Sequence, residues 1–223
     1  ELLEFIEKSP TCFHVVNTLE GILHAGGFEK LQESHRWTLR PGGKYYVTRN
    51  GSSIIAFCVP KVIEGFHIMA THSDSPTFKL KELPEISVEK KYTKLNVEGY
   101  GGMLMSTWFD RPLSAAGRLL VRDGERIISK LVNVDRDLLL IPSLAIHMNR
   151  GVNEGYKFNV QKDLLPLYGD ENVSGTFMAV VAEAARVDVQ HIMGHDLFLY
   201  PRVHGSIWGE NGCYISSARL DDL

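Results

Sequence analysis

Two turn dipeptides, Asn50-Gly51 and Asp123-Gly124, restrict how this chain folds, because each separates two runs of β-favouring residues. Asn, Asp and Gly adopt the left-handed backbone of a tight hairpin turn more readily than other residues do. The flanking runs are residues 44–49, 53–59, 117–122 and 125–132. We therefore expect two β-hairpins, one in each half of the chain.

Residues 2–26 have apolar side chains at helical spacing, and Ser9-Pro10-Thr11 interrupts the pattern. This predicts two helices joined by a turn. Ser9 is a good N-cap because Pro10 then occupies the first helical position, where its missing N–H costs nothing. Gly26-Gly27 is a good C-terminal stop.

The chain becomes richer in strands and turns after Pro76. Further β-favouring runs lie at residues 86–88, 93–97, 196–200 and 214–217. Residues 172–186 are instead rich in alanine and carry apolar side chains on one helical stripe, which predicts a helix. These patterns indicate an α/β protein with a helical start and a β-rich second part.

The apolar run from Phe66 to Ala70 ends in His72-Ser73-Asp74 and is stopped by Pro76. A short apolar run after Gly65 predicts a strand buried on both faces. Side chains two residues apart in a strand share a face, so His72 and Asp74 are expected to point the same way. Imidazole is a suitable zinc ligand, and a nearby carboxylate can fix its tautomer or bind metal. By itself His-x-Asp is weak evidence, because the pattern is common.

The composition excludes several classes of protein. The chain has 223 residues, 44% of them apolar, which supports a hydrophobic core. Its net charge of −3 gives no basic surface for nucleic acid. No apolar run approaches the roughly 18 residues of a membrane span, and no signal peptide is evident, so we expect a cytoplasmic protein with no membrane partner. The three widely spaced cysteines favour reduced thiols over a disulfide framework.

Three other residues are candidates with competing interpretations. Asp221 lies in a short polar segment after an expected strand, so it suits a metal ligand, although most Asp residues are simply solvated. Asp110 stands beside Arg111, which favours a structural ion pair over a catalytic role. His147 has apolar neighbours, and from these alone a core histidine is the better interpretation.

Six ordered segments together resemble the aspartyl aminopeptidases, which are zinc metallopeptidases with two metals in a shared site. The segments span nearly the whole chain. They are Ser9-Pro10-Thr11-Cys12-Phe13-His14, residues 47–53, Thr71-His72-Ser73-Asp74-Ser75-Pro76, Tyr100-Gly101-Gly102 with Thr107-Trp108-Phe109-Asp110-Arg111, residues 141–150, and residues 215–222. Six matches in order are much more specific than any one of them.

The resemblance implies roles for four residues. His72 is implied to bind one zinc, Asp221 to bridge two zinc ions, and Asp74 to serve catalysis by orienting His72. His147 is implied to reach the substrate in a neighbouring subunit's active site. The family's remaining ligands and its general-base glutamate are expected beyond Leu223, so we expect an N-terminal portion with an incomplete site and little activity alone.

The resemblance also implies a domain plan and an activity. A peptidase domain with a mixed sheet flanked by helices, residues 1–82 and 209–223, is implied to be interrupted by a β-rich dimerisation domain, residues 83–208. The implied activity is removal of N-terminal Asp or Glu from peptides by metal-activated water, in a homo-oligomer that is a dodecamer built from dimers. Two alternatives stay open: a non-catalytic assembly module, and a related di-metal peptidase of other specificity.

Overall fold

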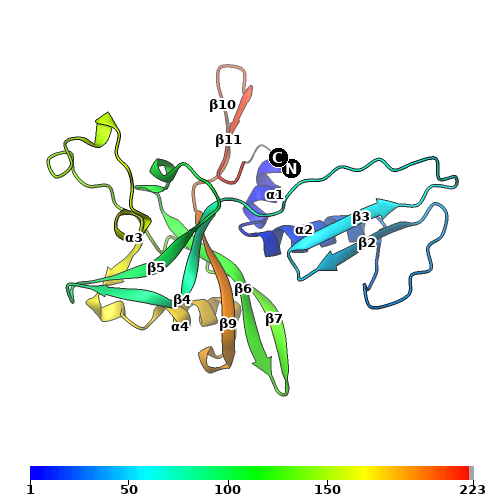
Figure 1. Ribbon diagram of the computed structural model, residues 1–223, viewed down its shortest axis with the longest axis horizontal. Helices are drawn as coiled ribbons and strands as arrows, with labels where there is room; N and C mark the ends of the chain where they lie inside the picture. The colour runs from blue at the N-terminus through cyan, green and yellow to red at the C-terminus, as the bar shows by residue number, and fades with distance from the viewer. Residues whose placement is uncertain (221–223) are drawn as a thin grey trace. The chain divides into compact units, whose positions relative to one another are not determined.

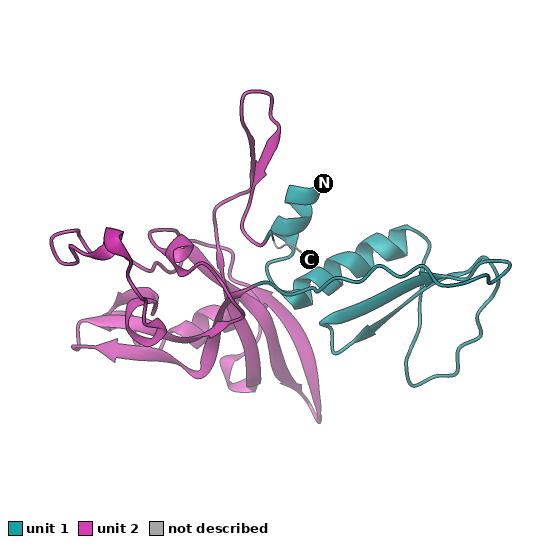
Figure 2. Ribbon diagram, turned by 45° about the horizontal axis from the view of Figure 1, so that its top comes forward, with its two compact units in different colours: residues 1–75, 220–223 teal, residues 76–219 magenta. Residues whose placement is uncertain are grey.

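The computed structural model describes residues 1–220 of the chain, which form two compact units. The first contains residues 1–75 and Leu220, and the second contains residues 76–219 (Figure 2). The boundary expected between residues 82 and 83 would fall inside one continuous strand, β4 (Thr77–Val88). The division between the two units instead lies between Ser75 and Pro76, before β4 begins. The roles assigned to the two domains remain predictions.

The first unit begins with the two expected helices, α1 (Leu2–Lys8) and α2 (Cys12–Ala25), seen in Figure 1. The predicted N-cap is wrong. Thr11, with an extended backbone, is the N-cap of α2, whereas Ser9 is the C-cap of α1. The Ser9 N–H donates to the carbonyl of Ile6, so Ser9 closes the first helix and is not available to open the second.

A three-stranded sheet follows the helices, in the order β1 (Glu29–Lys30), β2 (Lys44–Arg49) and β3 (Ser53–Cys58). The first expected hairpin is confirmed, because β2 and β3 pair antiparallel from Lys44–Cys58 to Arg49–Ser53. Asn50 and Gly51 both have a positive φ in the turn, as such a turn requires.

The second unit is built on a six-stranded sheet in the order β7-β6-β9-β4-β5-β8, and every pairing in it is antiparallel. Besides β4, its strands are β5 (Tyr92–Tyr100), β6 (Leu113–Asp123), β7 (Arg126–Asn133), β8 (Leu167–Asp170) and β9 (Ile192–Pro201). The hairpin expected at Asp123-Gly124 is confirmed as β6–β7. A separate hairpin joins β10 (Ser206–Trp208) to β11 (Tyr214–Ser216).

Short helices complete the second unit. The helix expected at residues 172–186 is α4 (Phe177–Ala185), preceded by the 3-10 turn Glu171–Val173. The other short helices are Met105–Trp108, Val152–Glu154, α3 (Val160–Asp163) and Val189–His191. Within residues 1–220, no helix is both long and apolar enough to cross a membrane.

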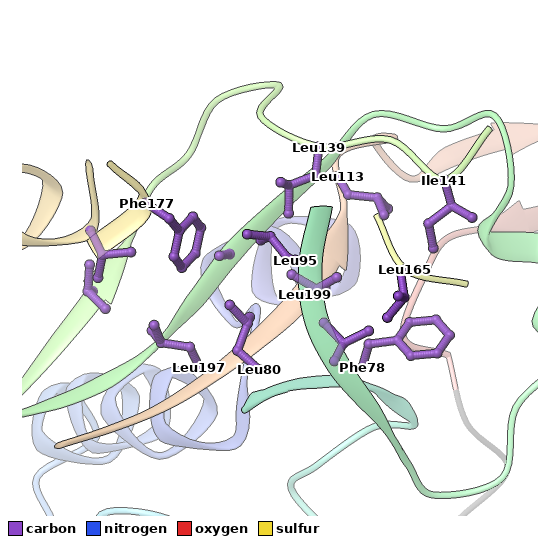
Figure 3. Close-up of a cluster of buried hydrophobic side chains, with 14 of the residues drawn as sticks. Phe78, Leu80, Leu95, Leu113, Leu139, Ile141, Leu165, Phe177, Leu197 and Leu199 are labelled. Carbon is purple, nitrogen blue, oxygen red and sulfur yellow. The ribbon is translucent and has the colours of Figure 1, made fainter. Parts of the chain in front are cut away.

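The core of the second unit is formed by the sheet together with α4 and the buried residues of the connecting segments. Figure 3 shows this cluster, in which side chains from several strands lie between Phe177 of α4 at one end and Ile141 and Leu165 at the other. Alternate residues along each strand point into this cluster, and Leu197 and Leu199 of β9 are both fully or almost fully buried. Burial of this kind contributes about 25 cal/mol per Å² of apolar surface, so the cluster is the main stabilising element of the unit.

The strand expected from Phe66 to Ala70 is wrong. These residues form no strand, and Phe66 and Met69 are 87% and 97% exposed. A strand needs a neighbour for its backbone N–H and carbonyl groups, and apolar side chains alone do not provide one. Among the described residues, β3 is the outermost strand of its sheet and pairs only with β2.

Gly117 marks the closest approach between β6 and β9. A Cβ atom there would lie 1.9 Å from the carbonyl oxygen of Asp196. We expect Gly117→Ala to lower the free energy of unfolding by about 3 kcal/mol, because one of the two strands must move. Gly194→Ala is the matched control on the same ladder, since its nearest atom would be Leu120 Cδ1 at 3.8 Å. Equal urea midpoints for both variants would contradict the close approach.

His14 makes the stability of the first unit depend on pH. Burial lowers the pKa of His14 to about 4, and its Nδ1 lies 2.8 Å from Thr11 Oγ1. Between pH 6.5 and 4 the unfolded chain therefore binds the extra proton, so the free energy of unfolding falls as the pH falls through this window. The total loss is at most about 3 kcal/mol.

This dependence is measured by urea unfolding at several pH values. His14→Gln should remove the slope between pH 6.5 and 4. His24→Gln, at an exposed position of the same helix, should keep it. An unchanged slope in His14→Gln would show that another group causes the effect.

Candidate functional site

His72 and Asp74 contact each other just before β4. The Nδ1 atom of His72 lies 3.2 Å from Asp74 Oδ1 and 2.8 Å from the backbone oxygen of Asp74. Both oxygens are acceptors, so Nδ1 carries the hydrogen, and a metal ion would bind through Nε2. The two side chains are 37% and 40% exposed, which keeps the pair accessible from solvent.

A hydrogen bond to the β2–β3 turn holds this segment in place. The Ser73 hydroxyl donates to the backbone carbonyl of Ser52 at 2.7 Å. This hydrogen bond lies in the segment that the sequence predicted to follow a buried strand. Sequence reasoning missed Ser73, because a side chain that bonds to a carbonyl 21 residues away leaves no local pattern.

His72 fits a zinc site as one ligand. Its second nitrogen is engaged by a carboxylate and a carbonyl, the arrangement that fixes a metal-binding imidazole. A catalytic zinc takes three protein ligands, and within residues 1–220 no group of three or more His, Cys, Asp or Glu side chains is placed to hold a metal ion. The other expected ligand, Asp221, lies outside the described residues. The described part of the chain therefore provides one oriented donor.

His147 lies in an exposed loop, so its interpretation as a core histidine is wrong. The loop contains two short turns, in which the N–H of Met148 donates to Ala145 at 2.8 Å and that of Asn149 to Ile146 at 3.2 Å. Leu144 and Met148 are 61% and 74% exposed. Apolar side chains gathered on an exposed loop are typical of a surface that becomes buried in an assembly.

Asp110 holds the start of this loop. Its Oδ1 accepts a hydrogen bond from the backbone N–H of Ser143 at 2.8 Å, and its own N–H donates to the carbonyl of Ile141 at 2.9 Å. The bond from Ser143 lowers the pKa of the Asp110 carboxyl. The sequence suggested an ion pair with Arg111, but in residues 1–220 this carboxylate is bonded to Ser143, whose backbone N–H donates to it.

The fold is of the α/β class, and comparison with known proteins identifies the family. The model of the Aminopeptidase I zinc metalloprotease (M18) family matches residues 5–223. The chain belongs to this family. The family-level resemblance noted in the sequence and the α/β fold class are thereby confirmed.

Similar proteins are longer than this chain. A probable M18 family aminopeptidase 2 from Clostridium novyi (strain NT) is 46% identical over 233 residues, which cover 100% of this chain and 54% of that protein. The chain thus spans about half the length of the curated relatives it matches.

Two solved structures share the fold. A chain in the cryo-EM structure of the Ape4 and Nbr1 complex has a TM-score of 0.93 and 36% identity, over 99% of this chain and 47% of that one. The S. cerevisiae mApe1 dodecamer has a TM-score of 0.78 and 29% identity, over 99% of this chain and 51% of that one.

Proposed function

We propose that the protein containing these residues is a zinc-dependent aminopeptidase that removes N-terminal Asp or Glu from peptides. The contact between His72 and Asp74 is the observation that carries the proposal, because a histidine oriented by a carboxylate suits a metal ligand. Membership of a zinc metalloprotease family supports the choice of metal.

The residues have separate tasks in this proposal. His72 would bind zinc through Nε2, and Asp74 accepts the Nδ1 hydrogen and so fixes the tautomer of the ring. Asp221 is the proposed bridging ligand, since a carboxylate has two oxygens and could bind two metal ions. When bound, zinc polarises the peptide carbonyl and lowers the pKa of water, the chemistry that hydrolysis requires. Asp74 acts through His72 and does not contact the substrate.

His147 is proposed to bind substrate in the active site of a neighbouring subunit. Its loop supports this role, because Leu144, Ile146 and Met148 are exposed around the histidine and would be buried by a neighbour. An imidazole N–H donates to carbonyl and carboxylate oxygens, the groups of an acidic N-terminal residue. The preference for Asp and Glu itself rests on the resemblance of the six ordered segments to aspartyl aminopeptidases.

The same loop supports a homo-oligomer. We propose that dimers form through the second unit and assemble into a dodecamer, the state named for the similar mApe1 structure. The cytosol is the proposed compartment. None of the three cysteines, all within the described residues, forms a disulfide, which agrees with a reducing environment.

Loss of His72 should abolish most of the activity. The test uses the product of the complete reading frame that contains this chain, with added zinc, and measures release of N-terminal Asp from a short peptide. We expect His72→Ala to lower kcat/KM at least about 100-fold, because mutation at a metal site removes a ligand or its support. His67→Ala is the matched control, since His67 is exposed in the same segment, and it should retain activity. Equal activity in the wild type and His72→Ala would refute the assignment.

Substrate preference is tested separately, with peptides that begin with Asp, Glu, Leu or Lys. Faster release of Asp and Glu supports the proposed specificity. Faster release of Leu or Lys, with the same loss in His72→Ala, would instead identify a di-metal peptidase of other specificity.

Loss of the Asp74 carboxylate should weaken zinc binding. We expect Asp74→Ala to lower zinc affinity about tenfold, at the weak end of the effect for residues that orient metal ligands. The backbone oxygen of Asp74, 2.8 Å from Nδ1, remains as an acceptor and limits the loss. Competition with a zinc chelator measures the affinity, and Asp74→Asn should fall between the wild type and Asp74→Ala. Wild-type affinity in Asp74→Ala would contradict the orienting role.

A further inference from the structure

We propose that Asp110 is a positioning residue that fixes the base of the His147 loop and so sets where His147 is presented. The proposal rests on the proposed function for the task of His147, but the contacts that carry it belong to Asp110 and its neighbours. Here the His147 loop means residues 143–158, from the residue whose N–H donates to the Asp110 carboxylate to the aromatic residue at the end of the loop.

Asp110 binds the departing end of the loop at two points. Its N–H donates to the Ile141 carbonyl at 2.9 Å, and its Oδ1 accepts from the Ser143 N–H at 2.8 Å. Pro142 lies between these residues and has no N–H of its own. One residue therefore holds the chain on both sides of the proline, which defines the direction in which the loop leaves.

Phe109 holds the returning end of the same loop. Its ring packs against the ring of Phe158, with the centroids 5.0 Å apart. Phe109 also forms a parallel β-bridge with Ile141, which is completely buried. The adjacent residues Phe109 and Asp110 thus close both ends of the loop on the core of the second unit.

The backbone of Asp110 explains why an aspartate suits this place. Its φ is +56°, in the left-handed region that Asp and Asn adopt more readily than other non-glycine residues. This conformation allows its N–H and its short carboxylate to reach Ile141 and Ser143 in the same turn of chain. A carboxylate that accepts from a backbone N–H forms a charge-assisted bond, stronger than a neutral one.

The loop beyond the base depends on this anchor. From Leu144 to Met148 every residue is exposed. The recorded backbone bonds of this stretch are local turns, such as Met148 to Ala145. Release of Ser143 would therefore loosen the segment around His147 without removing any core side chain.

Three variants separate the contributions of Asp110. Asp110→Asn keeps an acceptor oxygen and tolerates the positive φ but removes the charge, so it should weaken the bond to Ser143 without breaking it. Asp110→Gly keeps the backbone conformation but removes the acceptor. Asp188→Gly is the matched control, because Asp188 Oδ1 accepts from the Gln190 N–H at 2.9 Å in another part of the same unit. If Asp110→Gly does not fold, the exchange rates in Asp110→Asn decide instead, because Asn keeps the positive φ and only weakens the bond to Ser143.

The first measurement is hydrogen exchange of the backbone amides in residues 143–158. We expect at least about tenfold faster exchange at Ser143 and across residues 144–149 in Asp110→Gly, a smaller increase in Asp110→Asn, and wild-type exchange in Asp188→Gly. Wild-type exchange in Asp110→Gly would overturn the proposal directly. Because this readout requires no activity, it does not depend on the proposed function.

The second measurement is peptide hydrolysis by the product of the complete reading frame, in a double-mutant cycle with His147→Ala. We expect Asp110→Gly to raise KM in the wild-type background and to have no further effect in the His147→Ala background. A rise of the same size in both backgrounds would overturn positioning through His147. If His147→Ala itself leaves KM and kcat unchanged, the substrate role in the proposed function fails, and the exchange result alone decides whether Asp110 fixes the loop.

Discussion

The pairing of β6 with β9 is the interaction on which the second unit depends. It runs from Leu113–Pro201 to Val121–Ile192, and the buried faces of both strands form the centre of the core. At Gly117 the strands approach so closely that no side chain fits. The start of β6 also bonds to Leu139 in both directions, which fixes the chain just before Ile141 and Ser143. The β6–β9 pair therefore fixes Leu139, and Leu139 in turn fixes the start of the His147 loop.

Local pattern predicted the elements that are stabilised locally. The two turn dipeptides gave hairpins because Asn50, Gly51 and Gly124 all take the positive φ that such turns need. The strand expected at residues 66–70 failed because its formation depends on a neighbouring strand, and apolar composition contains no information about that neighbour. The prediction that Ser9 caps α2 failed for a related reason, since the hydrogen bond from the Ser9 N–H to the Ile6 carbonyl already closes α1.

For the candidate site, too, the sequence pointed to the residue types but not to the distant contacts that support them. His72 and Asp74 were expected to point the same way at the end of a strand; no strand forms there, but the structure does place Nδ1 and Oδ1 3.2 Å apart. Their support was not predictable, because Ser73 bonds to Ser52 and Asp110 to Ser143, across 21 and 33 residues. Such bonds join a side chain to a backbone group whose identity does not depend on residue type. Such bonds therefore cannot be recognised in the sequence, whereas a metal ligand can be, because only a few residue types bind metals.

His72 and His147 share one mode of support, although they belong to different units. Each lies outside regular secondary structure, and each segment is held by a hydrogen bond between a side chain and the backbone. The Ser73 hydroxyl donates to a carbonyl near His72, and the Asp110 carboxylate accepts from the Ser143 N–H near His147. Functional residues on loops need such anchors, because a loop has no ladder of hydrogen bonds to fix it on its scaffold. Many hydrogen bonds fix the position of a helix or strand, whereas only a few fix these two segments. Substitutions at Ser73 and Asp110 are therefore expected to displace His72 and His147 while leaving the cores intact, which separates the geometry of the site from the stability of the fold.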